Sequence, residues 1–138
     1  MGRMFAKLLL PILLMPAMSH AANWERIAQG GNTTVNVDIE SIVKLKNGMR
    51  KVWVEYILTE PEKSIEGKPY MRIVNLYSVN CEEKTSAAER ELLYDAVLQG
   101  KVVQDIKIPR ARLQFEESVP ESFAEIMVGF VCKAKLKK

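Results

Sequence analysis

Apolar and polar residues alternate along most of the chain after residue 23, and this period of two predicts β-strands. The segment 33–37 is rich in β-branched residues and alternates in the manner of a half-buried strand. Asp38 follows it and can cap a single helical turn that ends at Ser41. The pattern predicts strands over residues 24–29, 33–37, 42–45, 49–58, 70–80 and 102–108.

Turn residues separate several of these segments. Asn47 and Gly48 stand between two apolar runs, and Asn-Gly accepts the positive φ angles of a type I′ turn, so residues 42–58 are predicted to form a hairpin. Residues 59–69 are polar, contain two prolines and are predicted to form a loop. The strand 70–80 has apolar residues on both faces, which indicates a central strand or a strand whose outer face meets a partner.

Residues 85–97 fit two structures. Ala88, Leu92 and Ala96 follow helical spacing, and the local composition also favours a helix. The same stretch alternates with period two, however, and residues 98–101 could turn it back into the strand that follows. The local pattern therefore leaves helix and strand open.

The last element is predicted to be an amphipathic helix. Ser118 and Glu121 have the spacing of a capping box, with a proline between them in the first turn. Apolar residues then recur at helical spacing on one face, which we expect to pack against the sheet. They are Val119, Phe123, Ile126, Met127 and Phe130. On a continuous helix Cys132 would point away from this face, so the helix is expected to end after Phe130 if Cys132 is to reach the sheet.

The first 21 residues have the order of a secretory signal peptide. Arg3 and Lys7 precede an apolar run over 8–18 that is too short to span a bilayer, and cleavage is expected between Ala21 and Ala22. No cysteine stands directly after this point to carry a lipid anchor, and no second apolar stretch offers an integral membrane segment. The expected product is exported and lies in the periplasm, at the cell surface or outside the cell. The predicted parts are a signal peptide over 1–21, one domain over 22–132 and a basic tail over 133–138.

The positive charge of the whole chain comes from its two ends. Of 20 basic and 17 acidic residues, loss of Arg3 and Lys7 leaves 18 basic residues against the same 17 acidic ones. Four lysines lie in the last six residues, so the body before them carries a net negative charge. This distribution argues against a nucleic-acid-binding face.

The residues that carry most enzyme chemistry are missing from the mature chain. Cys81 and Cys132 are the only cysteines, and in an oxidising compartment we expect a disulfide between them. His20 is the only histidine and leaves with the signal peptide, so Ser-His, Cys-His and zinc arrangements cannot form. The carboxylate pairs 82–83 and 116–117 lie in predicted turns, where neighbours do not face each other across a cleft. We therefore expect no enzyme, no catalytic residue, no cofactor and no metal site.

The order of these motifs resembles the surface-adhesin protein E family of Gram-negative bacteria. The resemblance covers essentially the whole mature chain, and the placement of the two cysteines is its most specific part. It is carried by Trp24 at the start, the segments 35–38 with 41–42 and 52–54, the strand 70–80 running into Cys81, and the capped helix running into Cys132.

This resemblance implies a fold and a function. The fold is α+β: a curved antiparallel sheet of about six strands, with the C-terminal helix on its concave face and one disulfide tying helix to sheet. It favours a strand over 85–97. The implied function is non-enzymatic binding of host extracellular-matrix or serum proteins, with homodimers also implied.

The start of the strand 70–80 offers candidate ligand-binding residues. Lys68, Tyr70 and Arg72 place an aromatic ring between two cations, which suits an acidic protein segment. An ordinary solvated strand end is the alternative interpretation of these three residues. A soluble periplasmic protein that binds or inhibits an envelope protein is the alternative function.

Overall fold

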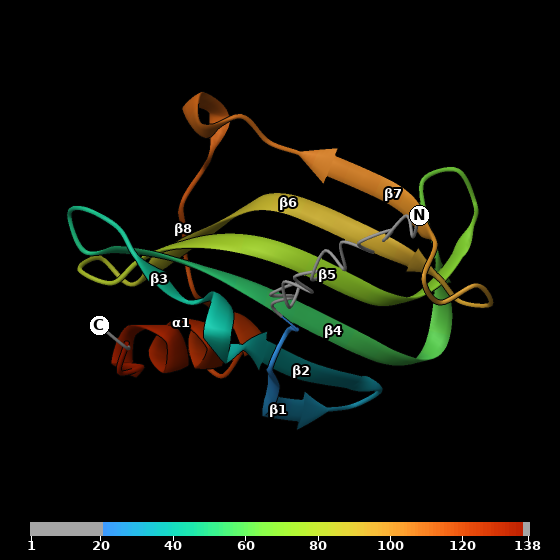
Figure 1. Ribbon diagram of the computed structural model, residues 1–138, viewed down its shortest axis with the longest axis horizontal. Coiled ribbons are helices and arrows are strands. Elements are labelled where there is room, and N and C mark those ends of the chain that lie inside the picture. Colours follow the sequence, from blue (N-terminus) through green and yellow to red (C-terminus); the bar gives the residue numbers. More distant parts are fainter. Residues whose placement is uncertain (1–20, 137–138) are drawn as a thin grey trace, which may run out of the picture.

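The computed structural model describes residues 21–136 and shows an open antiparallel sheet with one α-helix (Figure 1). The predicted signal peptide, apart from Ala21, lies outside the described residues, as do the last two lysines of the tail. The strands are β1 (Trp24–Gly30), β2 (Thr33–Asp38), β3 (Val43–Lys44), β4 (Met49–Lys63), β5 (Pro69–Asn80), β6 (Thr85–Asp95), β7 (Val102–Lys107) and β8 (Glu116–Glu117). The helical elements are the 3-10 turns η1 (Ile39–Ser41) and η2 (Arg110–Arg112) and the helix α1 (Phe123–Lys133).

Six strands form the body of the sheet in the order β1-β2-β4-β5-β6-β7, while the short β3 pairs with β4 and the short β8 pairs with β6. The register shifts within four of the antiparallel ladders, and such bulges bend the strands. The three long strands β4, β5 and β6 arch above α1 (Figure 1). This arrangement confirms the fold that the resemblance implied.

Residues 85–95 of the ambiguous segment 85–97 form the strand β6, and the last two residues of the segment lie in the turn that follows. The helix-favouring residues of β6 lie between β5 on one side and β7 on the other, so its backbone groups are taken up by two ladders. Pairing with two neighbours overrides the local preference. The turn after it is held by Asp95, whose carboxylate accepts hydrogen bonds from the amides of Val97 at 2.7 Å and Leu98 at 2.8 Å.

The predicted hairpin is present. Asn47 and Gly48 have φ angles of 60° and 72°, and the amide of Met49 donates to the carbonyl of Lys46 over 3.2 Å. A Cβ atom on Gly48 would lie 2.8 Å from Cγ of Glu82, so both the backbone angle and the space favour glycine there.

The prediction of a loop over 59–69 was wrong for most of its length. β4 continues to Lys63, and the pairs Glu62 with Tyr70 and Lys63 with Pro69 extend the β4–β5 ladder to a short turn. Pro61 was taken as a strand breaker, yet it falls where the register shifts between Ile57 and Glu62, so no regular ladder bond is required of it.

The predicted capping box was also wrong. Glu121 has a φ angle of 63°, which excludes it from a helix, and α1 begins one turn later. The N-cap is Ser122, whose hydroxyl accepts from the amide of Glu125 over 3.3 Å. Ser122 and Glu125 have the same spacing as Ser118 and Glu121, so the chain holds two overlapping signals and folds on the second.

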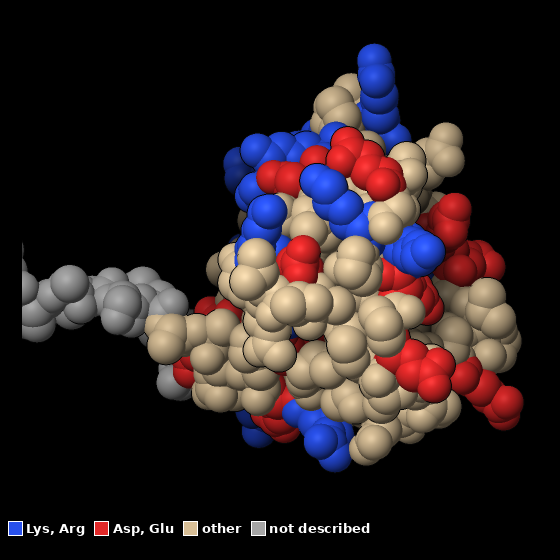
Figure 2. Space-filling model, turned by 90° about the vertical axis from the view of Figure 1, so that its right-hand side faces the viewer, with Lys and Arg blue, Asp and Glu red and all other residues tan. Residues whose placement is uncertain are grey.

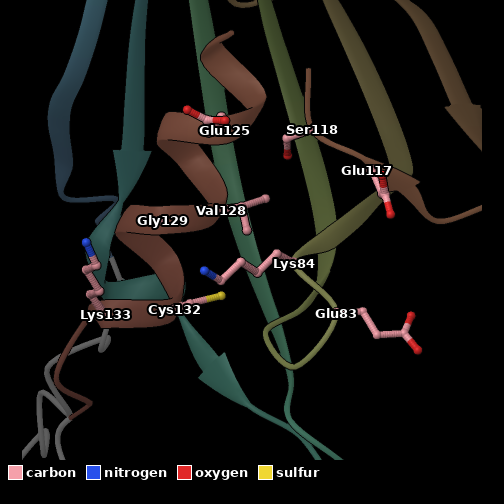
Figure 3. Close-up of a pocket in the computed structure, with 9 residues that line it drawn as sticks. All are labelled: Glu83, Lys84, Glu117, Ser118, Glu125, Val128, Gly129, Cys132 and Lys133. Carbon is pink, nitrogen blue, oxygen red and sulfur yellow. The ribbon is translucent and has the colours of Figure 1, made fainter. Parts of the chain in front are cut away.

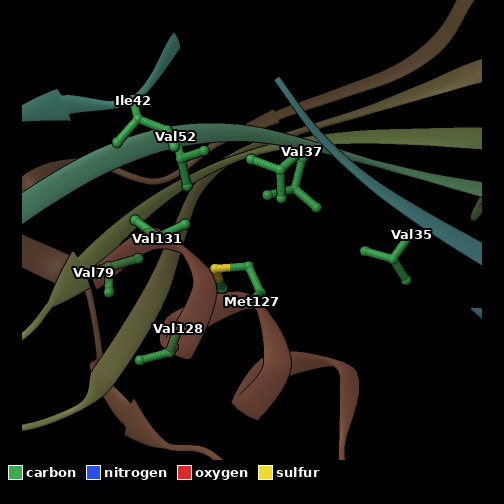
Figure 4. Packing of buried hydrophobic residues seen from close by; sticks show 9 residues of the cluster. Val35, Val37, Ile42, Val52, Val79, Met127, Val128 and Val131 are labelled. Carbon is green, nitrogen blue, oxygen red and sulfur yellow. The ribbon is translucent and has the colours of Figure 1, made fainter. Parts of the chain in front are cut away.

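The core lies between the sheet and α1 (Figure 4). Its centre is Met127, which has no exposed surface and packs among valines of β2, β4 and β5. The buried cluster consists of Val35, Val37, Ile42, Val52, Val54, Val79, Met127, Val128 and Val131.

The buried face of α1 differs from the predicted stripe. It is centred on Met127, Val128 and Val131, whereas Val119 and Ile126 are exposed. Cys132 follows Val128 by four residues and so lies at the edge of the buried face. The helix therefore continues to Lys133 without unwinding, and the expected end after Phe130 was wrong.

Two interactions fix the C-terminal end of α1. Cys132 forms the disulfide with Cys81 directly after β5, with the two Cα atoms 5.6 Å apart, as expected. Nη1 of Arg50 donates to the carbonyls of Val131 at 2.8 Å and Ala134 at 2.9 Å, which satisfies acceptors that a helix end leaves open. No helix within the described part of the chain is long and apolar enough to cross a membrane.

Candidate functional site

The structure gives Lys68, Tyr70 and Arg72 separate carboxylate partners. The ammonium of Lys68 lies 3.4 Å from Glu66 in the same turn. The hydroxyl of Tyr70 donates to Oε2 of Glu62 over 3.0 Å. Nε of Arg72 donates to Oε2 of Glu55 over 2.8 Å.

Arg72 belongs to a cluster in which five neighbouring strands each contribute one side chain. Its guanidinium carbon lies 4.7 Å from the ring centre of Tyr94 and 5.8 Å from that of Trp24. The partner carboxylate of Glu55 also accepts from Nδ2 of Asn36 over 2.9 Å. The order across the sheet is Trp24 on β1, Asn36 on β2, Glu55 on β4, Arg72 on β5 and Tyr94 on β6, and we call this set the arginine cluster.

Strand register assembles the arginine cluster on the face of the sheet opposite the core. Asn36 is paired with Glu55, and Arg72 is paired with Tyr94. Arg72 is also paired with Ile57, which places it diagonally across from Glu55 at a distance that a long side chain spans. The core valines of β2 and β4 alternate with these residues and point the other way.

The cluster combines a buried anion with a partly exposed cation. The side chain of Glu55 is 6% exposed, whereas that of Arg72 is 36% exposed. A carboxylate with so little contact with water needs both of its hydrogen bonds, and a cation between two rings gains further stabilisation from their electron-rich faces. The guanidinium carries five N–H donors, so its solvent-facing edge has donor capacity beyond the bond from Nε.

Sequence reasoning selected Arg72 but missed its four companions, which are Trp24, Asn36, Glu55 and Tyr94. The available signal was a charged residue inside the apolar run of β4, where Glu55 interrupts valines and aromatics. An isolated carboxylate in a central strand requires a cationic partner. Which cation supplies it depends on register, and that is not contained in the local pattern.

A second polar group lies on the core side of the sheet, among tyrosines. The hydroxyls of Tyr56 and Tyr77 are 2.8 Å apart, and Nδ2 of Asn75 donates to the Tyr77 hydroxyl over 3.1 Å. Burial, followed by the neighbouring Tyr77, raises the pKa of Tyr56 far above its usual range. Tyr56 is therefore a neutral hydrogen-bonding group and not a base at physiological pH.

A cleft of about 490 Å³ runs beside the disulfide, between α1 and the turn that links β5 and β6 (Figure 3). Val128, Gly129 and Cys132 form its helical wall, and Lys84 reaches toward them from the turn. The hydroxyl of Ser118 is buried at its side, without a hydrogen-bond partner in the described structure. Acidic and basic side chains both surround the cleft, so its charge selects no class of ligand.

The described part of the structure contains no cluster of metal-ligating side chains and no free thiol. Among residues 21–136, no three His, Cys, Asp or Glu side chains come together in a way that could hold a metal ion. Both cysteines of the sequence are consumed in the disulfide.

The family model of surface-adhesin protein E matches residues 24–133, which is most of the chain. The chain belongs to the surface-adhesin protein E family. It is therefore an adhesin-like protein of a family that is exported, and the family suggests a protein that binds without catalysing a reaction.

Solved structures show the same fold at low sequence identity. A structure of Haemophilus influenzae protein E matches with a TM-score of 0.57 and 15% identity, covering 86% of this chain and 90% of that one. A second crystal form of that protein matches with a TM-score of 0.59 and 14% identity, covering 86% and 94% of the two chains. No curated protein matches the chain by sequence.

Proposed function

We propose that the mature chain is a non-enzymatic binding protein whose arginine cluster contacts a protein ligand, with host extracellular-matrix or serum proteins as the ligand class. The observation that carries this proposal is the partly exposed guanidinium of Arg72, which lies near the rings of both Tyr94 and Trp24. Trp, Tyr and Arg are the residue types that dominate binding energy at protein interfaces. The family supports the adhesin-like class of function.

Pre-organisation favours Arg72 as a contact residue. Its Nε is already held by Glu55, and its guanidinium carbon lies within 5.8 Å of the centres of two aromatic rings. A ligand that uses the solvent-facing N–H groups therefore does not have to order a free side chain, which is a large part of the cost of most arginine contacts. A carboxylate or a backbone carbonyl of the ligand has the matching geometry.

Lys68 and Tyr70 extend the proposed site at the start of β5. Their present partners, Glu66 and Glu62, lie on or beside the exposed turn between β4 and β5. Exposed pairs of this kind contribute little to stability, so an acidic ligand segment can replace either partner at small cost.

The test is binding of the purified mature chain to immobilised laminin, fibronectin, collagens and whole serum, measured by biolayer interferometry. Saturable binding to at least one of these that is lost in a Tyr94→Ala variant with an unchanged unfolding midpoint would support the proposal. Binding only to a protein of the periplasmic extract would instead favour the alternative function. Binding to none of these samples would reject the proposed ligand class.

Localisation and assembly are proposed together with this function. We infer cleavage between Ala21 and Ala22, which mass spectrometry of the exported protein tests directly. Protease added to intact cells should remove a surface-displayed chain and spare a periplasmic one. Light scattering over a range of concentrations tests the homodimer that the resemblance implies.

A further inference from the structure

We propose that the end of the sheet remote from α1 inserts aliphatic side chains into the surface of a zwitterionic phospholipid bilayer. Three aliphatic residues are strongly exposed to solvent there: Ile65 is 86% exposed, Val97 is 81% exposed and Leu98 is 60% exposed. They lie in two turns, residues 64–68 between β4 and β5 and residues 96–101 between β6 and β7. We call these two turns the aliphatic tips.

The aliphatic tips are held together by hydrogen bonds. The amide of Ile65 donates to the side-chain carbonyl of Gln104 on β7 over 3.2 Å. The amide of Ala96 donates to the carbonyl of Pro69 over 3.0 Å. Both turns lie at the same end of the molecule in Figure 1, away from the helix. Figure 2 faces this end, where uncharged side chains occupy the middle of the view with charged ones around them.

Charges near the aliphatic tips nearly balance. In the sequence, three lysines lie in or next to these two turns, Lys63, Lys68 and Lys101, against four acidic residues, Glu60, Glu62, Glu66 and Asp95. Three of the four carboxylates are engaged: Glu62 by Tyr70, Glu66 by Lys68, and Asp95 by the amides of its own turn. A nearly neutral rim suits zwitterionic headgroups, and insertion of aliphatic groups, not attraction between charges, would drive such binding.

The size of the tips favours a lipid surface over a protein partner. Stable protein interfaces bury on the order of 800 Å² on each side, with aromatic and arginine anchors near the centre. The tips offer three aliphatic side chains on two narrow turns, without an aromatic residue among them. A bilayer needs no complementary pocket and accepts such projections individually.

Vesicle sedimentation tests this inference with the full mature chain and phosphatidylcholine vesicles. We expect weak sedimentation that 0.5 M salt leaves unchanged and that the Ile65→Asp, Val97→Asp, Leu98→Asp triple variant weakens by at least about tenfold. The matched control is Val119→Asp, which alters an equally exposed aliphatic residue at 69% exposure outside the two turns and should sediment like the parent chain. All four positions are exposed, so unfolding midpoints should agree.

A fluorescent probe locates the contact. Brominated phosphatidylcholine should quench the fluorescence of the tryptophan introduced by Leu98→Trp, whereas it should not quench that of the tryptophan introduced by Val119→Trp.

The inference is overturned if the parent chain does not sediment, or if the triple variant sediments equally well. It is also overturned if sedimentation needs anionic lipid and disappears in 0.5 M salt, because that behaviour belongs to the basic tail. These variants leave Arg72 and Tyr94 in place, so protein binding is measured separately.

Discussion

The Nε–H of Arg72 donates to Oε2 of Glu55 over 2.8 Å, from one central strand to the next. This bond couples the proposed ligand contact to the stability of the sheet, because Glu55 is buried and depends on Arg72 for its counter-charge. A substitution at Arg72 therefore acts on binding and on folding together, and variants must be chosen to separate the two effects.

Removing the cation should destabilise the sheet. Arg72→Ala leaves the buried Glu55 carboxylate with Asn36 as its remaining hydrogen-bond partner in this cluster, so we expect a loss of about 2 kcal/mol in the free energy of unfolding. Urea unfolding followed by circular dichroism measures it. Arg90→Ala is the control: Arg90 pairs with Asp105 on the surface, and its loss should change the midpoint little. Equal losses in the two variants would show that burial of Glu55 has no special effect.

Two serines distinguish the predicted helix start from the observed one. Ser122→Ala removes the hydroxyl that accepts from Glu125, so we expect a loss of about 1 kcal/mol in the free energy of unfolding. Ser118→Ala removes a buried hydroxyl without a partner in the described structure and should be neutral or slightly stabilising. Urea titrations of both variants give the comparison. A larger loss at Ser118 than at Ser122 would contradict the observed cap.

Local patterns predicted those parts of the fold that depend on neighbouring residues. The turn at Asn47 and Gly48 follows from backbone preference, and period-two alternation locates the strands of the core. The helix start was predicted wrongly because two capping signals overlap, Ser118 with Glu121 and Ser122 with Glu125. In the structure Glu121 has a positive φ, which rules out the first of them. The strand state of residues 85–95 required two paired neighbours, which the local sequence does not contain.

The candidate site was predictable only in part, for the same reason. Arg72 stands out as a cation on a strand with apolar residues on both faces. Its companions come from strands up to 48 residues away in sequence, between Trp24 and Arg72, and they meet through register alone. Of the exposed tip residues, Ile65 lies in the segment 59–69 that was predicted to be a loop, whereas Val97 lies in the segment 85–97 whose local pattern left helix and strand open.

The disulfide should stabilise the chain without determining its fold. It joins residues 51 positions apart in sequence, for which the chain-entropy model gives about 4 kcal/mol before any native-state strain is subtracted. The Cys81→Ser, Cys132→Ser double variant should therefore unfold at lower urea concentration. Arg50 still holds the end of α1 and the sheet ladders are unchanged, so the far-ultraviolet circular dichroism of the folded state should persist. Loss of the sheet signal in buffer would contradict this account.

Stability should fall in acid partly because of Glu89. Burial by itself raises the pKa of Glu89, but the hydrogen bonds from Lys51 at 2.8 Å and Ser78 at 2.7 Å outweigh it, and the pKa lies below the usual value. The unfolded state therefore takes up the proton first as pH falls, and the stabilisation present at pH 7 is lost below an unfolded pKa of about 4.3.

Unfolding free energies between pH 7 and pH 3 test this prediction. The difference between the parent chain and Glu89→Gln should be largest at pH 7 and should shrink as pH approaches 3. The lowered pKa values of Asp95 and Asp105 act with the same sign in both proteins, so they cancel in the difference. A difference that stays constant across this range would show that Glu89 does not titrate as its contacts imply.

The central claim is that the aromatic setting of Arg72 makes it a ligand contact. The most direct measurement compares Arg72→Lys with Arg90→Lys in binding to whichever matrix or serum protein the parent chain captures. Both arginines pair with a carboxylate over 2.8 Å, but only Arg72 lies within 5.8 Å of the ring centres of Trp24 and Tyr94. Lysine keeps the charge and loses the planar, stacked guanidinium. We predict that Arg72→Lys, compared at a temperature where its unfolding curve shows it fully folded, weakens binding at least about tenfold while Arg90→Lys binds like the parent chain. Equal affinities for the two variants and the parent would contradict the claim.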